Sequence, residues 1–253
     1  MLQQGIRADF AVTAKPGYAV AWEEVGLAWF RIRIHGTQAY VGRRHVLVDD
    51  NPIVTSMHVI ARLEDWFKDY EARHTSGLVA PQGAIGAIEG GWTYKPAFTP
   101  AACDIYVDLR LSPRCSPMQA WQELKKPLDE VPQSTGARIA CDMILAIPGA
   151  GTAPDNWIIR SATRAWEAVE GRVHTPFLRT SGQTEAVILR RHGIPTARLG
   201  LPARMSSDPD APTAERPAHN MGYVNARDIR RLAECLIRII VDTCTRPLDE
   251  VGL

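Results

Sequence analysis

The sequence predicts an α/β protein in which a β-α-β-β-α-β segment interrupts a partial, doubly wound α/β layer. Two observations predict this class. Between residues 26 and 147, alternating and helical apolar patterns follow one another in the order β-α-β-β-α-β. After residue 148, amphipathic helices alternate with short apolar segments. The 253 residues, 45% of them hydrophobic, are enough for one large or two small domains with buried cores.

The inserted segment begins with a strand over 28–36, in which apolar and charged residues alternate. A polar loop is expected over 37–50. Asn51 and Pro52 then form a helix start, with Asn51 as N-cap and Pro52 in the first turn, and the helix extends to about residue 73.

Two further strands are expected over 84–89 and 102–111. A second helix starts at Ser116-Pro117 and is expected to reach about residue 131, with Pro127 kinking it or ending it early. A last strand over 137–147 completes the ferredoxin-like order of a split βαβ module.

The flanking segments predict the second layer. The expected elements are a buried strand over 8–14, helices over 156–169, 182–191 and 226–243, and a short strand over 194–200. A doubly wound sheet normally has more strands to cover its helices, so this layer is predicted to be partial.

Composition excludes several classes. The formal net charge of +1 offers no basic excess for nucleic acid or an acidic membrane. Five cysteines without a C-x-x-C pair indicate reduced thiols, and the apolar run over 236–241 is too short to span a bilayer. With no signal peptide visible, we expect a cytoplasmic protein.

Five motifs occur in a fixed order along the chain. They are Ala8-Asp9-Phe10 to Pro16, Gly36-Thr37-Gln38-Ala39-Tyr40 before Asp50-Asn51-Pro52, Gly90-Gly91 with Pro100 and Asp108-Leu109-Arg110, Ser181-Gly182-Gln183-Thr184-Glu185, and Ala218-His219-Asn220-Met221-Gly222-Tyr223-Val224. Together they resemble the acetylornithine deacetylase, succinyl-diaminopimelate desuccinylase and aminoacylase family of zinc amidohydrolases and carboxypeptidases.

The resemblance implies a division of the chain. Residues 1–25 and 148–253 would form a partial catalytic-type domain, and residues 26–147 a lid that dimerises. In the family, metal-bound water attacks an amide next to a carboxylate, and a glutamate acts as general base. Arg110 matches the lid arginine that holds the substrate carboxylate, and His219 matches the last metal ligand.

Departures from the family pattern point away from hydrolysis. The first metal ligands and the general base would lie before the point where this chain begins, so we expect the N-terminal part of the catalytic domain to be absent. Lys15 stands where the pattern has a liganding glutamate, and a protonated ammonium repels a cation. Tyr40 takes the place of the lid histidine that polarises the substrate carbonyl, and could still donate a hydrogen bond.

Each candidate residue has a plainer interpretation. His219 can be a loop histidine unless a partner supplies further ligands, Tyr40 a surface residue of the lid, and Lys15 half of a surface salt bridge. Arg110 can pair with Asp108 instead of a ligand. The remaining histidines, among them His74, show no metal spacing.

Three functional hypotheses follow. The chain is a truncated or degenerate relative that does not hydrolyse by itself and acts as a dimerisation or substrate-binding subunit. Alternatively, it is part of an active zinc hydrolase of N-acyl amino acids or peptides, or a binder of small carboxylates. We expect a homodimer or heterodimer through the lid helix 52–73 and an adjacent edge strand, the partner being a second copy or a full-length homologous subunit. Zinc is not expected on this chain alone.

Overall fold

The computed structural model describes residues 4–5, 7–15, 17–46, 50–202 and 225–253. It divides into two compact units. Unit 1 consists of Met1–Glu24, Ala150–Leu178 and Gln183–Leu253, and unit 2 of Val25–Gly149 and Arg179–Gly182. The predicted α/β class with an inserted ferredoxin-like module is confirmed.

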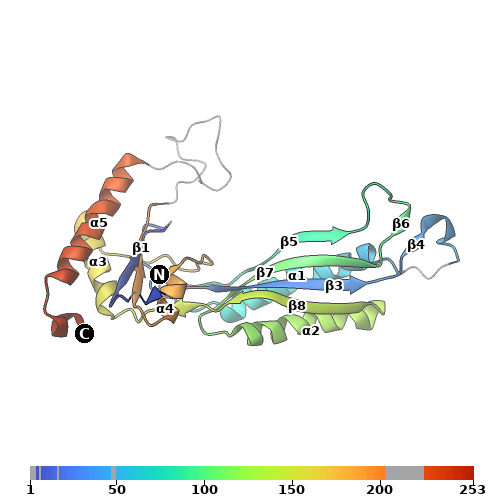
Figure 1. Ribbon diagram of the computed structural model, residues 1–253, viewed down its shortest axis with the longest axis horizontal. Coiled ribbons are helices and arrows are strands. Elements are labelled where there is room, and N and C mark those ends of the chain that lie inside the picture. The colour runs from blue at the N-terminus through green and yellow to red at the C-terminus, as the bar shows by residue number, and fades with distance from the viewer. Residues whose placement is uncertain (1–3, 6, 16, 47–49, 203–224) are drawn as a thin grey trace. The chain divides into compact units, whose positions relative to one another are not determined.

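Unit 2 is built on a four-stranded antiparallel sheet. Its strands are β3 (Gly26–His35), β5 (Gly83–Gly90), β7 (Ala102–Leu111) and β8 (Arg138–Ile147), in the order β5-β7-β3-β8 (Figure 1). The central pair β3–β7 is in register from Gly26 opposite Leu111 to His35 opposite Ala102. β5 and β8 are therefore the two edges of the sheet.

Helices α1 (Pro52–His74) and α2 (Pro117–Thr135) cover one face of this sheet, and their apolar sides form one core with the inward residues of β3 and β7. The Asn51 side chain caps α1 by accepting from the Ile53 N–H at 3.1 Å. The Ser116 hydroxyl caps α2 by accepting from the Gln119 N–H at 3.1 Å. These caps lie where the sequence predicts the helix starts.

The expectation that Pro127 ends α2 early is wrong, because the helix continues through Pro127 and Pro132 to Thr135. A proline inside a helix loses one backbone hydrogen bond. Here Leu124, Leu128 and Val131 are buried in the core on either side of Pro127, so tertiary packing offsets that loss. Gly136, with a φ of 72°, ends the helix in the left-handed conformation that glycine adopts without strain.

The segment expected to be a polar loop contains short elements. β4 (Ala39–Tyr40) pairs with β6 (Phe98–Thr99), and a 3-10 turn, Val41–Arg43, follows β4. Two-residue strands carry no periodic signal, so neither was predicted from the sequence.

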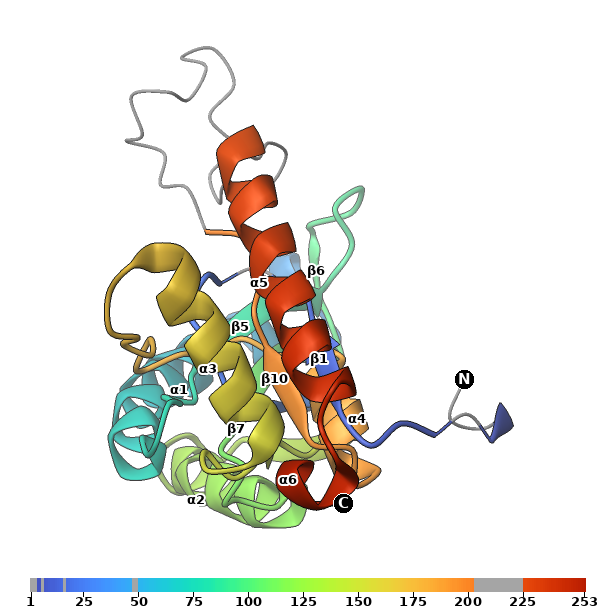
Figure 2. The same cartoon turned by 90° about the vertical axis from the view of Figure 1, so that its left-hand side faces the viewer.

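Unit 1 contains a parallel pair of strands, β1 (Ala11–Thr13) and β10 (Thr196–Arg198), and an antiparallel pair, β2 (Glu23–Glu24) and β9 (Ala150–Gly151). Its helices are α3 (Trp157–Glu170), α4 (Ala186–Arg191), α5 (Ala226–Cys244) and α6 (Leu248–Val251). α3 and α5 lie side by side (Figure 2) and share a core with β1 and β10. The helix expected from residue 182 begins only at Ala186.

No helix among the described residues is both long and apolar enough to cross a membrane.

A candidate carboxylate-binding site in unit 2

Arg110 occupies a fixed place at one end of β7. Its neighbours Leu109 and Leu111 face the core and are fully buried, so the alternation of the strand turns Arg110 to the face away from the helices. The Arg110 backbone N–H donates to the Gln82 carbonyl at 2.8 Å, and the Tyr70 hydroxyl donates to the Arg110 carbonyl at 3.1 Å. The backbone that carries this guanidinium is thus held from both sides.

The Arg110 guanidinium pairs with a carboxylate on its own strand. Nε lies 3.0 Å from Asp108 Oδ1, and Nη2 donates to Asp108 Oδ2 at 3.2 Å. A guanidinium has five N–H donors, so three remain for other acceptors. Both side chains are about 30% exposed, which leaves the pair open to a ligand.

A cavity of about 240 Å³ adjoins this pair. It is lined by Gln82, Gly83, Ala84, Asp108, Arg110 and Ser181. The Ser181 hydroxyl accepts from the Gln82 N–H at 3.2 Å and so joins the 181–182 segment to the rim. At ~30 Å³ per water the cavity holds about eight waters, enough for a carboxylate and its neighbouring atoms but not for a large ligand.

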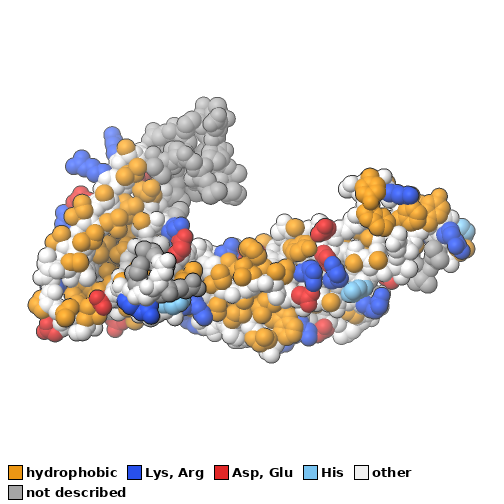
Figure 3. Space-filling view, viewed as in Figure 1, with side chains coloured by type: hydrophobic (Ala, Val, Ile, Leu, Met, Phe, Trp, Pro, Cys, Tyr) orange, Lys and Arg blue, Asp and Glu red, His pale blue; other side chains and the backbone are white. Residues whose placement is uncertain are grey.

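Tyr40 lies outside this cavity, at the other end of unit 2. β4 follows the end of β3 at which His35 pairs with Ala102, whereas Arg110 pairs with Leu27 near the start of β3. Tyr40 packs on Phe98 with ring centroids 5.4 Å apart and is 50% exposed. Apolar side chains gather at this β4–β6 end (Figure 3), so the tyrosine belongs to an exposed apolar tip.

His219, the expected metal ligand, lies outside the described residues. Lys15 does lie within them, and its ammonium is 3.0 Å from Glu185 Oε1. A hydrogen bond at the Glu185 backbone and the Lys15 ammonium lower the pKa of the Glu185 carboxyl. The position that the resemblance assigns to a metal-binding glutamate therefore holds a cation in an ion pair. Lys15 and Glu185 do not fit a zinc centre.

Unit 1 contains a buried ion-pair network that the sequence did not reveal. Glu24 Oε2 lies 3.3 Å from Arg190 Nη1, and Glu24 Oε1 lies 3.2 Å from Arg198 Nε. The Thr184 hydroxyl donates to both oxygens of Glu24, at 3.1 and 2.9 Å. Burial lowers the pKa of Arg190 to about 10, and Glu24 opposes that shift. The network joins β2, α4 and the end of β10, which gives it a structural role.

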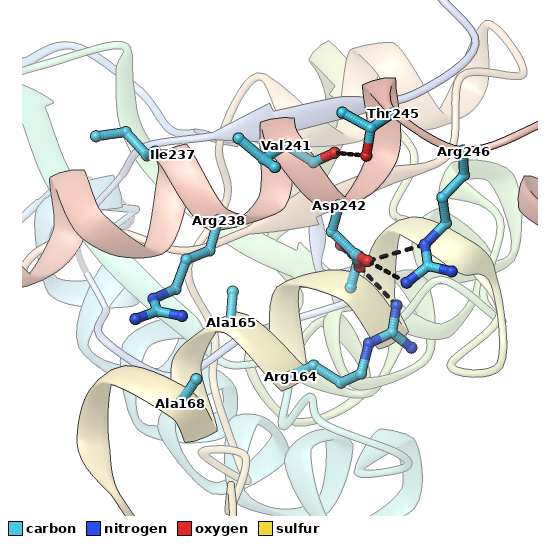
Figure 4. A pocket seen from close by; sticks show the side chains of 10 residues that line it. Arg164, Ala165, Ala168, Ile237, Arg238, Val241, Asp242, Thr245 and Arg246 are labelled. Carbon is cyan, nitrogen blue, oxygen red and sulfur yellow. Dashed lines mark hydrogen bonds and ion pairs between the residues drawn. The ribbon is translucent and has the colours of Figure 1, made fainter.

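A groove of about 530 Å³ runs between α3 and α5, and Figure 4 shows its lining. Its carboxylate, Asp242, accepts from Arg164 at 2.7 Å and from Ser161 at 2.7 Å, and from Arg246 at 2.9 Å. Burial would raise the pKa of Asp242, but these hydrogen bonds outweigh it and lower the pKa to about 2. Because Arg164 and Arg246 already donate to Asp242, and Arg246 also pairs with Glu250, the groove is a poorer candidate for an anion than the Arg110 cavity.

One group of potential metal ligands occurs among the described residues, and it lies in unit 2. It consists of His74, Cys115 and Glu123, whose ligand atoms all lie within 4.8 Å of one another. His74, which shows no metal spacing in the sequence, thus has two potential metal ligands beside it in space. His74 lies 49 positions before Glu123 in the sequence, so residue spacing carried no signal for the cluster.

The protein is thus a two-unit α/β protein, and its ferredoxin-like module carries the Arg110 cavity. Residues 23–135, most of which belong to unit 2, match the family model of the peptidase dimerisation domain. For this segment the resemblance to a peptidase family is supported, while the acetylornithine deacetylase group within it stays a prediction.

Solved structures share this fold. The chain is similar to the aminopeptidase PepT of Bacillus cereus (17% identity, TM-score 0.65, covering 96% of this chain and 59% of that one). It is also similar to a tripeptidase of Staphylococcus aureus (14% identity, TM-score 0.64, 97% and 60%). An amidase of the hydantoinase/carbamoylase family from Burkholderia multivorans matches with 12% identity and a TM-score of 0.65, over 94% and 56%. The chain thus spans less than two thirds of the length of these proteins.

Proposed function

We propose that this chain is a dimerising, carboxylate-binding relative of metal-dependent peptidases and amidases that does not hydrolyse amides by itself. Residues 1–25 and 148–253 would be its partial catalytic-type part, and residues 26–147 its lid. The observation that carries the proposal is an open edge strand, β5, beside exposed apolar side chains of α1.

The β5 edge is suited to pairing with another strand. Its sequence, Gly83 to Gly90, consists of small residues apart from two isoleucines and Glu89, so another backbone can approach closely. Ile88 is 51% exposed on this strand. Unpaired strand edges present a row of N–H and C=O groups that a second chain can satisfy.

Helix α1 adds an apolar surface beside that edge. Ile53 and Met57 are 41% and 64% exposed and lie one helical turn apart, on the same face. The Ile53 side chain lies next to Gly91, which directly follows β5. A two-fold axis beside β5 would therefore bury Ile53, Met57 and Ile88 against their equivalents in a second copy.

The opposite edge is less suited to pairing. On β8, Arg138 and Asp142 are exposed, and Asp142 accepts from Arg31 at 2.7 Å. Charged side chains on an edge strand oppose pairing, because they would lose water on contact. A homodimer through β5 and α1 is thus our first proposal, and a heterodimer with a longer homologous chain would use the same surface.

The ligand-binding part of the proposal rests on Arg110. Its remaining donors can hold a carboxylate in the adjoining cavity, and the rim offers Ser181 as a further polar group. The Lys15–Glu185 pair argues against hydrolysis by this chain, because it occupies a position at which zinc needs an anionic ligand. Zinc, if it binds in unit 1, would depend on ligands such as His219 and others from a partner.

Sedimentation velocity of matched variants tests the interface. Ile88→Glu and Met57→Glu should convert the dimer to a monomer at micromolar concentration. Ile144→Glu on β8 and Met118→Glu on α2 are the controls, since these residues are 55% and 51% exposed and lie away from β5. A wild-type monomer, or equal dissociation by the control variants, would overturn the proposal.

A further inference from the structure

We propose that His74, Cys115 and Glu123 form a divalent metal site, suited to zinc, that ties α1 to α2 inside unit 2. All three residues belong to unit 2, whereas Lys15, which stands where the family resemblance would have a metal ligand, belongs to unit 1. The three ligands of the site come from three different places: the last residue of α1, the connection between β7 and α2, and the second turn of α2.

The geometry suits a tetrahedral ion. His74 Nε2 lies 2.9 Å from Glu123 Oε2, and the ligand atoms of all three residues are within 4.8 Å. Zinc bonds of ~2.0–2.3 Å at tetrahedral angles place ligand atoms about 3.3–3.6 Å apart. Side-chain movements of about 1 Å would therefore bring all three ligand atoms to the distances that one ion requires, and the ion would replace the contact between the imidazole and the carboxylate.

The ligand types favour zinc over calcium or magnesium. Thiolate and imidazole are borderline or soft donors, and hard cations prefer sites made of oxygen atoms. The His74 and Glu123 side chains are only 12% and 13% exposed, and Cys115 is 4% exposed. A partly enclosed set of sulfur, nitrogen and oxygen donors is the composition expected for such an ion.

Neighbouring groups orient the ligands. Tyr70 stacks against the His74 ring with centroids 4.3 Å apart, which fixes the plane of the imidazole. Gln119 Nε2 donates to Glu123 Oε1 at 3.3 Å, and Arg73 Nη1 donates to Glu123 Oε2 at 2.6 Å. An ion bound to Oε2 would displace Arg73, whose side chain is 50% exposed and can move into water, while Oε1 keeps its hydrogen bond from Gln119.

The same residue types could also form a thiol nucleophile with a histidine and an acid. That arrangement requires an accessible thiolate. Cys115 is only 4% exposed, so a substrate could not reach its sulfur. It also contributes to none of the cavities described above. Metal binding is the chemistry that remains, because it needs no substrate access.

Titration of the full chain with Co²⁺ tests the site. Cobalt bound to a thiolate gives a charge-transfer absorption that carboxylate and imidazole ligands do not give. We expect this band to saturate at one Co²⁺ per chain and to be displaced by Zn²⁺. Cys115→Ser should abolish the band, and His74→Gln should weaken Co²⁺ binding at least about tenfold.

Cys244→Ser is the matched control, because Cys244 is the exposed cysteine of α5 and lies in unit 1. The Cys244→Ser variant should leave the absorption band unchanged. His219→Gln should also leave it unchanged, and this result would distinguish the His74 site from any metal binding in unit 1 under the proposed function. Circular dichroism verifies that each variant is folded. If Cys115→Ser does not fold, the His74→Gln and Cys244→Ser titrations decide. No band with wild type at a large excess of Co²⁺, a band that Cys244→Ser removes, or undiminished binding by His74→Gln would overturn the proposal.

Discussion

Arg110 and Tyr40 lie near opposite ends of the same antiparallel sheet. Arg110 lies eight positions after Ala102 on β7, and Tyr40 lies beyond the end of the sheet at which Ala102 pairs with His35. At ~3.3 Å per residue this is a separation of about 26 Å or more. A carboxylate held by Arg110 therefore cannot contact Tyr40 of the same chain, and Tyr40 could act only on a neighbouring subunit.

Substitution of these two residues should therefore have independent effects. Arg110→Lys should weaken binding of an N-acyl amino acid about tenfold or more, because lysine cannot reproduce the paired N–H donors. Tyr40→Phe should leave that affinity unchanged. Isothermal titration calorimetry measures both. Equal losses in the two variants would show that they share one ligand-binding site.

Asp108 competes with a ligand for the Arg110 guanidinium. Asp108→Asn should raise the affinity for carboxylates about two- to fivefold, since an exposed ion pair is worth ~0.5–1 kcal/mol. Asp104→Asn is the matched control: this aspartate lies on the same strand and face and accepts from Arg33 at 2.8 and 2.6 Å. An equal gain in both variants would point to the overall charge of the face and not to Arg110.

Two salt bridges of unit 1, Glu24–Arg190 and Lys15–Glu185, should differ in energy. Glu24→Gln leaves Arg190, whose side chain is 1% exposed, without its buried anionic partner, and should lower the free energy of unfolding by about 3–5 kcal/mol. Lys15→Ala breaks a pair whose side chains are 43% and 61% exposed and should cost less than about 1 kcal/mol. Urea-induced unfolding measures both values. A Lys15 effect as large as that of Glu24 would contradict the assignment of Lys15 to an exposed ion pair.

His174 should make stability depend on pH. Its Nε2 accepts from the Val20 N–H at 2.9 Å, and its ring lies edge-on to Trp166. Burial lowers the pKa of His174, Arg172 adds to that effect and Glu167 opposes it. Because the folded state binds the proton less readily than the unfolded state, this contribution is complete above pH ~6.5 and is lost as the pH falls toward the folded-state pKa.

The urea midpoint of the wild type should accordingly fall between pH ~7.5 and ~5.5. His174→Gln, whose amide oxygen can accept the Val20 hydrogen bond but does not titrate, should show a smaller fall over the same range. Parallel pH profiles for the two proteins would exclude His174 as the titrating group.

The sequence alone determined the elements whose signals are local. The alternation of β3 and β7 and the caps at Asn51 and Ser116 follow from side-chain periodicity and from orphan N–H groups at helix starts, so they could be read without a structure. The same periodicity placed Arg110 on a strand, and its motif placed it next to Asp108.

Tertiary structure decided what depends on contacts between distant residues. Helix α2 continues through Pro127 because the residues around it pack in the core, although the helix propensity of proline favours a stop. The two-residue strands β2, β4, β6 and β9 exist because each pairs with another strand, and they are too short to give a periodic signal in the sequence. The cluster of His74, Cys115 and Glu123, the buried partners of Glu24 and the distance between Tyr40 and Arg110 all arise when separate elements meet. Local propensities act within a few residues, so only the folded chain could bring these groups together or keep them apart.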